Sequence, residues 1–179
     1  MAIVPDSKDW TWVIERPCPE CRFDTSSIGF SELPALIGAN AAGWDEVFSG
    51  PRALTTRPRP DKWSPLEYGC HVRDVFRLYD YRLSLMLTQD DPLFPNWDQD
   101  ETAVAERYDS QAPAAVATEL AEAAKVIAAS FAAVEPAQLS RKGRRSDGAQ
   151  FTVETFGRYF IHDPVHHLWD VTGGQRQAR

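Results

Sequence analysis

The chain has 179 residues, of which 43% are hydrophobic and 25% are charged, and its formal net charge is −7. A chain of this length suits one domain that buries about 70% of its unfolded surface, and the composition excludes wholesale disorder. The acidic balance excludes nucleic acid and anionic membranes as expected partners, because both are bound mainly through Lys and Arg.

Residues 1–30 are predicted to form an N-terminal arm, because their prolines and lack of periodicity are typical of irregular structure. The part before the sequence Cys18-Pro-Glu-Cys21 is expected to be an ordered but irregular segment or, alternatively, a short strand around Trp10 to Ile14. The first helix is expected to begin near Ser31, a candidate N-cap, and to end at Gly50.

The second helix has the clearest start in the chain. Ser64 at the N-cap, Pro65 at the first helical position and Glu67 three residues after Ser64 make a capping box. The helix should continue to about Thr88. A loop of about 20 residues follows, from Gln89 to Tyr108, and loops of that length are often functional.

Two further helices complete the predicted architecture. The third should run from about Ala112 to Val134, where apolar residues alternate steps of three and four. The basic sequence 141–145 is expected to be a solvated connector. The last helix, capped by Thr152, should extend to about Val171. We therefore predict an all-α four-helix bundle over residues 31–175.

The first residues after Met1 lack the basic and apolar regions of a signal peptide. The most apolar stretch, residues 126–134, is much shorter than the roughly 20 residues of a membrane span. With only three cysteines, the expected location is a reducing cytoplasm.

The histidines suggest a metal site. His162 and His166 are four residues apart, so both rings project from one helix face and can converge on one ion. His71 would supply a third nitrogen if the second and last helices are neighbours. His167 should lie outside this set, since it is about 100° around the helix from His166.

Neighbouring carboxylates are candidates to orient these ligands. Asp74 lies one turn from His71, and Asp170 lies one turn from His166. Alternatively, His71 is a satisfied core residue and the pair His162–His166 lies on a helix surface without a metal.

Cys18 and Cys21 leave three interpretations open. They are packed thiols in a tight turn, a redox-sensitive disulfide, or thiols near the metal site. A structural zinc ion would need two more ligands, and the sequence contains no second such pair and no unassigned histidine pair. Cys70 is expected to be a small core residue.

Two segments resemble the DinB-like superfamily, whose members include mycothiol-dependent maleylpyruvate isomerases and bacillithiol transferases. The sequence Trp63-Ser-Pro-Leu-Glu-Tyr-Gly-Cys-His71-Val-Arg-Asp74 resembles the start of its second helix, and His162-Asp-Pro-Val-His166 resembles its His-x-x-x-His motif. The resemblance implies a four-helix bundle in which His71, His162 and His166 bind Zn²⁺, Ni²⁺ or another divalent ion. It also implies a homodimer.

The function expected from these observations is metal-dependent transfer or hydrolysis on a small molecule. The resemblance implies a low-molecular-weight thiol as cosubstrate, with the metal lowering the pKa of a thiol or water. Trp63 and Tyr159 are candidate pocket walls, and Arg158 is a candidate ligand for a substrate carboxylate. The alternatives are a non-catalytic metal-binding or redox-sensing module and an interaction domain without metal.

Overall fold

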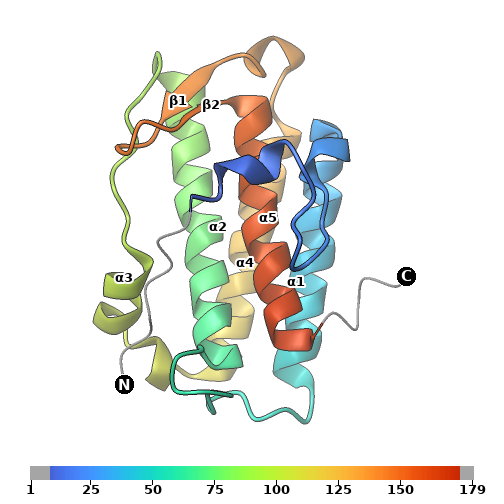
Figure 1. The fold of residues 1–179 in the computed structure, drawn as a ribbon, viewed down its shortest axis with the longest axis vertical. Coiled ribbons are helices and arrows are strands. Elements are labelled where there is room, and N and C mark those ends of the chain that lie inside the picture. Colours follow the sequence, from blue (N-terminus) through green and yellow to red (C-terminus); the bar gives the residue numbers. More distant parts are fainter. Residues whose placement is uncertain (1–8, 174–179) are drawn as a thin grey trace.

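Four long helices form the body of the molecule, a computed structural model that describes residues 9–173. They are α1 (Leu33–Ser49), α2 (Pro65–Thr88), α4 (Pro113–Ala132) and α5 (Val153–Thr172). Helices α4 and α5 each pack against both α1 and α2, so α1 and α2 stand at opposite corners of the bundle. Figure 1 shows α1 and α5 running in one direction and α2 and α4 in the other. The predicted four-helix bundle is confirmed. Residues 1–8 of the predicted arm and residues 174–175 at the predicted end of the bundle lie outside the described residues.

The start of α2 has the predicted capping box. Ser64 Oγ accepts a hydrogen bond from the Glu67 amide at 3.3 Å, and Glu67 Oε2 accepts one from the Ser64 amide at 2.8 Å. Arg57 also pairs with the Glu67 carboxylate. Burial acts to raise the pKa of Glu67, but the hydrogen bonds from Arg57 and Ser64 outweigh it and lower the pKa. The local sequence and the tertiary structure therefore favour the same helix start.

The ends of the other helices follow the sequence closely, with one difference. Thr152 caps α5 as predicted, and Gly173 ends it with a φ of 66°, a left-handed conformation that glycine adopts without strain. Helix α1 begins later than expected. A 3₁₀ turn, Phe30–Glu32, precedes it, and the residue at its N-cap is Glu32 rather than Ser31.

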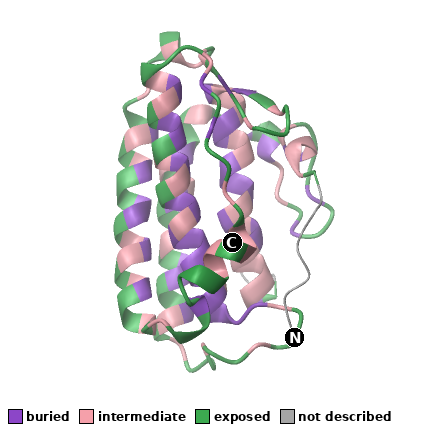
Figure 2. Ribbon diagram, turned by 90° about the vertical axis from the view of Figure 1, so that its left-hand side faces the viewer, coloured by how far each residue is buried: buried purple, intermediate pink, exposed green. Residues whose placement is uncertain are grey.

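Aromatic side chains join α5 to the rest of the core. The ring of Phe160 lies 5.9 Å from that of Phe76, 5.1 Å from that of Tyr79 and 5.4 Å from that of Phe131, measured between centroids. Phe160 is fully buried. Figure 2 shows the buried residues concentrated on the helix faces that point toward the bundle axis. Helix α5 is thus held in a defined position against both α2 and α4.

The N-terminal arm lies along α5 (Figure 1). It contains 3₁₀ turns at Thr11–Ile14 and Thr25–Ser27, and the Thr25 hydroxyl donates to the carbonyl of Val13 between them. Of the two alternatives for this segment, the structure shows the ordered but irregular one and not the strand around Trp10 to Ile14. A lone strand has no partner for its backbone hydrogen bonds here, and a 3₁₀ turn satisfies them locally.

Two connections contain structure that the sequence analysis did not predict. The long segment after α2 includes the short helix α3 (Gln99–Ala105). The basic segment is not a plain loop, because β1 (Lys142–Arg144) pairs antiparallel with β2 (Gln150–Thr152). No helix in the described part of the chain is long and apolar enough to cross a membrane.

Candidate metal centres

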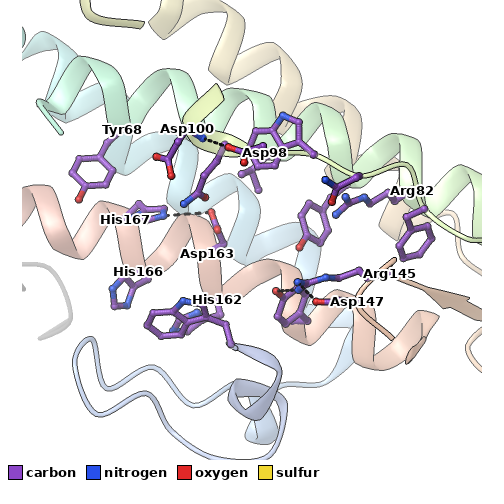
Figure 3. Close-up of a pocket in the computed structure, with 18 of the residues that line it drawn as sticks. Tyr68, Arg82, Asp98, Asp100, Arg145, Asp147, His162, Asp163, His166 and His167 are labelled. Carbon is purple, nitrogen blue, oxygen red and sulfur yellow. Dashed lines mark hydrogen bonds and ion pairs between the residues drawn. The ribbon is translucent and has the colours of Figure 1, made fainter. Parts of the chain in front are cut away.

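Helix α5 carries side chains of types that can bind metals, in two interleaved pairs. His162 and His166 form one pair spaced by four residues, and Asp163 and His167 form another, shifted by one residue. Adjacent helix residues point about 100° apart, so the two pairs face different neighbours. Figure 3 shows Asp163 and His167 directed toward α2, and His162 and His166 directed toward the N-terminal arm.

The pair Asp163–His167 faces His71 on α2. We call these three residues the α2–α5 centre. His71 Nε2 lies 3.3 Å from Asp163 Oδ1, and His167 Nε2 lies 3.9 Å from the same oxygen. The three ligand atoms lie within 4.8 Å of one another. Ligand atoms around one tetrahedral ion at Zn–N and Zn–O distances of about 2.1 Å are separated by about 3.4 Å. The spacing at this centre therefore fits a single divalent ion.

Buried polar atoms at the α2–α5 centre also fit a cation. His71 is fully buried, and neither of its ring nitrogens has a hydrogen-bond partner in the described structure. Asp163 Oδ1 is also a buried atom without a hydrogen-bond partner there. Burial acts to raise the pKa of Asp163, but the facing His71 and His167 outweigh it and hold this pKa well below its usual range. A carboxylate between two imidazoles is a set that first-row divalent metals bind readily.

Neighbouring side chains fix the orientation of His167. Asp170 Oδ2 lies 3.2 Å from His167 Nδ1, and Lys62 Nζ lies 2.8 Å from Asp170 Oδ1. Burial acts to raise the pKa of Asp170, but the hydrogen bonds from His167 and Lys62 lower it to about 2. An ionised carboxylate at Nδ1 leaves Nε2 of the neutral ring as the acceptor that faces the centre.

Aromatic rings surround the α2–α5 centre. The ring of His71 lies 5.3 Å from Trp63 and 5.6 Å from Trp97, and the ring of His167 lies 5.0 Å from Tyr68. These contacts restrict the rotation of both imidazoles and reduce the access of water.

A second group, which we call the arm centre, consists of Cys18, Cys21, His162 and His166. Cys18 Sγ lies 3.7 Å from His166 Nδ1, and Cys21 Sγ lies 3.7 Å from His162 Nε2. All four residues are buried, and their four ligand atoms lie within 4.8 Å of one another. This group joins the arm to α5.

Protonation at the arm centre follows from its burial. Burial raises the pKa of the Cys21 thiol to about 12, and burial together with the nearby His166 lowers the pKa of His162 to about 4. His162 is therefore a neutral imidazole near pH 7, the form that binds metals. The ring of Trp10 lies 5.3 Å from that of His162 and 5.4 Å from that of His166, and covers both.

A cavity of about 620 Å³ adjoins both centres. Asp163, His167 and His166 line one part of it, whereas Arg82 and Arg145 lie at the other end (Figure 3). Its volume is typical of a site for a small molecule. Aromatic and acidic side chains complete the wall, among them Trp63, Tyr79, Trp97, Asp98, Asp147 and Tyr159.

The structure does not group the three predicted ligands as expected. His71 is not within the same set as His162 and His166, and it lies instead with Asp163 and His167. His167, which was expected to lie outside the site, is part of the α2–α5 centre. The reason is the one-residue shift between the two pairs on α5, which turns one pair toward α2 and the other toward the arm.

The predicted orienting carboxylates also differ. Asp74 pairs with Arg73 and Arg77 and accepts a hydrogen bond from Tyr108, so its carboxylate is engaged away from His71. Asp170 lies 3.7 Å from His166 Nε2 but closer, at 3.2 Å, to the nitrogen of His167.

Of the predicted substrate-binding residues, Trp63 and Tyr159 line the cavity and Arg158 does not. Arg158 donates to Glu154 at 2.9 Å, one turn earlier on α5. Sequence reasoning missed Arg82 and Arg145 as the cationic residues of the cavity. No local motif identifies them, because they come from different elements.

The surroundings of Cys18 and Cys21 differ most from what the sequence predicts. With His162 and His166 assigned to the ion at His71, the sequence offers no ligands to complete a set with Cys18 and Cys21. The structure brings this histidine pair to the two thiols, which agrees with the third interpretation, thiols near a metal site. All three cysteines are free thiols in the structure.

Comparison with known proteins agrees with the fold. A family model described as the DinB superfamily matches residues 47–171, well over half of the chain. A solved structure, described as "YfiT from Bacillus subtilis is a probable metal-dependent hydrolase with an unusual four-helix bundle topology", is similar with a TM-score of 0.71 and 17% sequence identity, over 93% of this chain and 97% of that chain. No curated protein matches the chain.

Proposed function

The chain belongs to the DinB superfamily, and on that premise we propose that it is a metal-dependent hydrolase whose reactive site is the α2–α5 centre. The observation that carries the proposal is a set of buried ligand atoms without hydrogen-bond partners, the two ring nitrogens of His71 and Oδ1 of Asp163, beside a cavity of about 620 Å³. The structurally similar YfiT is described as a probable metal-dependent hydrolase, which supports the same class of reaction.

His71, Asp163 and His167 would hold the ion. A divalent ion bound there supplies Lewis acidity, which acidifies water and polarises a carbonyl or phosphoryl oxygen. Three protein ligands leave room for substrate, as in catalytic rather than structural sites. Because Asp170 holds the Nδ1 side of His167, the opposite nitrogen would be directed to the ion.

The far end of the cavity suits an anionic group of the substrate. The Nε atom of Arg82 is buried and has no hydrogen-bond partner in the described structure, while its Nη2 donates to the Pro95 carbonyl. Arg145 is already paired with Asp147 and donates to the Tyr159 hydroxyl. No carboxylate among the described residues pairs with Arg82, so its charge is the one in the cavity that a substrate carboxylate would neutralise.

The test is a panel of small esters and amides, each in neutral, cationic and carboxylate-bearing form. Metal-free protein is reconstituted with Zn²⁺, Ni²⁺ or Mn²⁺, and each substrate is offered with and without a low-molecular-weight thiol. We expect hydrolysis only with metal and a preference for the carboxylate-bearing members. A product that carries the thiol instead of the hydroxyl would indicate the transferase that the sequence analysis also considered.

A variant of Arg82 tests the role of the cavity in substrate binding separately from that of the metal. Arg82→Gln should raise KM for carboxylate-bearing substrates by about tenfold, roughly the loss of one charge-assisted hydrogen bond, and leave KM for neutral substrates unchanged. Equal hydrolysis by metal-free and reconstituted protein would contradict the proposal. An equal change in KM for all substrates would contradict the role of Arg82.

A further inference from the structure

We propose that the arm centre is a separate structural zinc site, in which Cys18, Cys21, His162 and His166 bind one Zn²⁺ and fasten the N-terminal arm to α5. This site differs from the α2–α5 centre in its residues, in its ligand chemistry and in its role. It does not depend on the proposed hydrolase activity.

The geometry of the arm centre fits a tetrahedral ion. With Zn–S of about 2.3 Å and Zn–N of about 2.1 Å, a sulfur and a nitrogen on one tetrahedral ion lie about 3.6 Å apart. The two sulfur–nitrogen distances in the structure, Cys18 to His166 and Cys21 to His162, are both 3.7 Å. Each thiol lies at the distance of a weak hydrogen bond to its imidazole, and this distance is within about 0.1 Å of the separation that a shared ion would impose.

The types of ligand favour zinc, and their number leaves no open coordination position. Two thiolates with two imidazoles form one of the recurrent structural zinc sets, and the soft sulfur ligands disfavour Mg²⁺ and Ca²⁺. Four protein ligands leave no position for substrate. Binding exchanges two thiol protons for one Zn²⁺, so the complete centre is electrically neutral, which suits its burial.

The turn that carries the cysteines is already folded in the required shape. The Cys18 amide donates to the Phe23 carbonyl at 3.0 Å, and the Arg22 amide donates to the Cys18 carbonyl at 2.8 Å. Arg22 has a φ of 61°, which closes the turn directly after the second cysteine. Both thiols therefore face the same side of the arm, toward α5.

The ion would fix one wall of the cavity. The arm contributes Trp10 and Glu20 to the cavity lining, and its described residues, 9–30, form no strand and no long helix. A segment of this kind has few backbone hydrogen bonds to the bundle and gains most from a metal crosslink. The zinc site thus gives the irregular arm a defined position beside the α2–α5 centre.

Metal analysis and cobalt substitution of the full chain, purified without a His tag, test this inference. We expect one equivalent of Zn²⁺ at the arm centre, in addition to any ion at the α2–α5 centre; this equivalent survives in Cys70→Ser and is lost in Cys18→Ser/Cys21→Ser. Cys70 is a matched control because it is a buried free thiol that packs in a separate cluster with Leu66, Tyr108 and Val116. Wild-type protein loaded with Co²⁺ should show thiolate-to-cobalt charge-transfer absorption, and the double variant should lack it.

Two results would overturn the inference. One is a double variant that retains as much zinc as the wild type. The other is cobalt-loaded wild-type protein without thiolate charge transfer, a result that decides the question even if the double variant does not fold. Wild-type protein that shows the cobalt–thiolate signal but hydrolyses no substrate of the panel would contradict the proposed function and leave the zinc site supported.

Discussion

Replacing His71 with alanine is expected to remove the ion of the α2–α5 centre and to lower hydrolysis by about 1,000-fold. Lewis-acid catalysis is worth several kcal/mol of transition-state stabilisation, and about 1.4 kcal/mol corresponds to a factor of ten in rate. His71 is fully buried and is the only ligand of this centre on α2, so no neighbouring side chain on that helix replaces it. The measurement combines metal content with kcat/KM on the best substrate of the panel.

The control for His71→Ala is Cys70→Ser, the adjacent buried residue on α2. Its side chain lies near the Tyr108 carbonyl and Gln111, away from both centres, so metal content and kcat/KM should stay at the wild-type level. His166→Ala should instead remove the ion of the arm centre. If His71→Ala kept all of its metal, the assignment of this residue to a metal centre would be wrong.

Replacing Phe160 with alanine should lower the free energy of unfolding by about 3–5 kcal/mol, the usual cost of removing a buried aromatic ring. The reason is the contact of this ring with Phe76, Tyr79 and Phe131, which ties α5 to both α2 and α4. Domains of this kind are stable by only about 5–15 kcal/mol, so the loss is a large part of the total. Denaturant unfolding of metal-free protein measures it directly.

Val126→Ala is the surface control for Phe160→Ala. Val126 lies on α4 with 55% of its surface exposed, so its truncation should change the free energy of unfolding by less than about 0.5 kcal/mol. Phe160→Leu, which keeps much of the apolar volume, should cost less than Phe160→Ala. Equal effects of Phe160→Ala and Val126→Ala would show that α5 is not held by the aromatic contacts described above.

The fold could be predicted from the sequence because its signals are local. Ser64, Pro65 and Glu67 determine where α2 begins, and Thr152 and Gly173 mark the two ends of α5. The predicted helix limits agree with the observed ones to within about two residues. The arm and the segment before β2 have no such periodic signal. The sequence therefore left a strand in the arm open as an alternative, and the loop predicted for the basic segment was wrong.

The site could be predicted only in part, because spacing along a helix defines pairs but not their partners. The pair His162–His166 was recognised, and the equivalent pair Asp163–His167 was overlooked because one member is an aspartate. Which pair faces α2 depends on the rotation of α5 about its axis, and packing of residues such as Phe160 sets that rotation. The meeting of Cys18 and Cys21 with α5 is a contact across more than 140 residues, which no local pattern shows.

The central claim is that α5 supplies ligands to two different ions. A crystal structure of the protein purified without a His tag, with anomalous difference maps on both sides of the zinc absorption edge, tests it most directly. The account predicts one anomalous peak among Cys18, Cys21, His162 and His166 and a second among His71, Asp163 and His167. A single peak bound jointly by His71, His162 and His166 would contradict it.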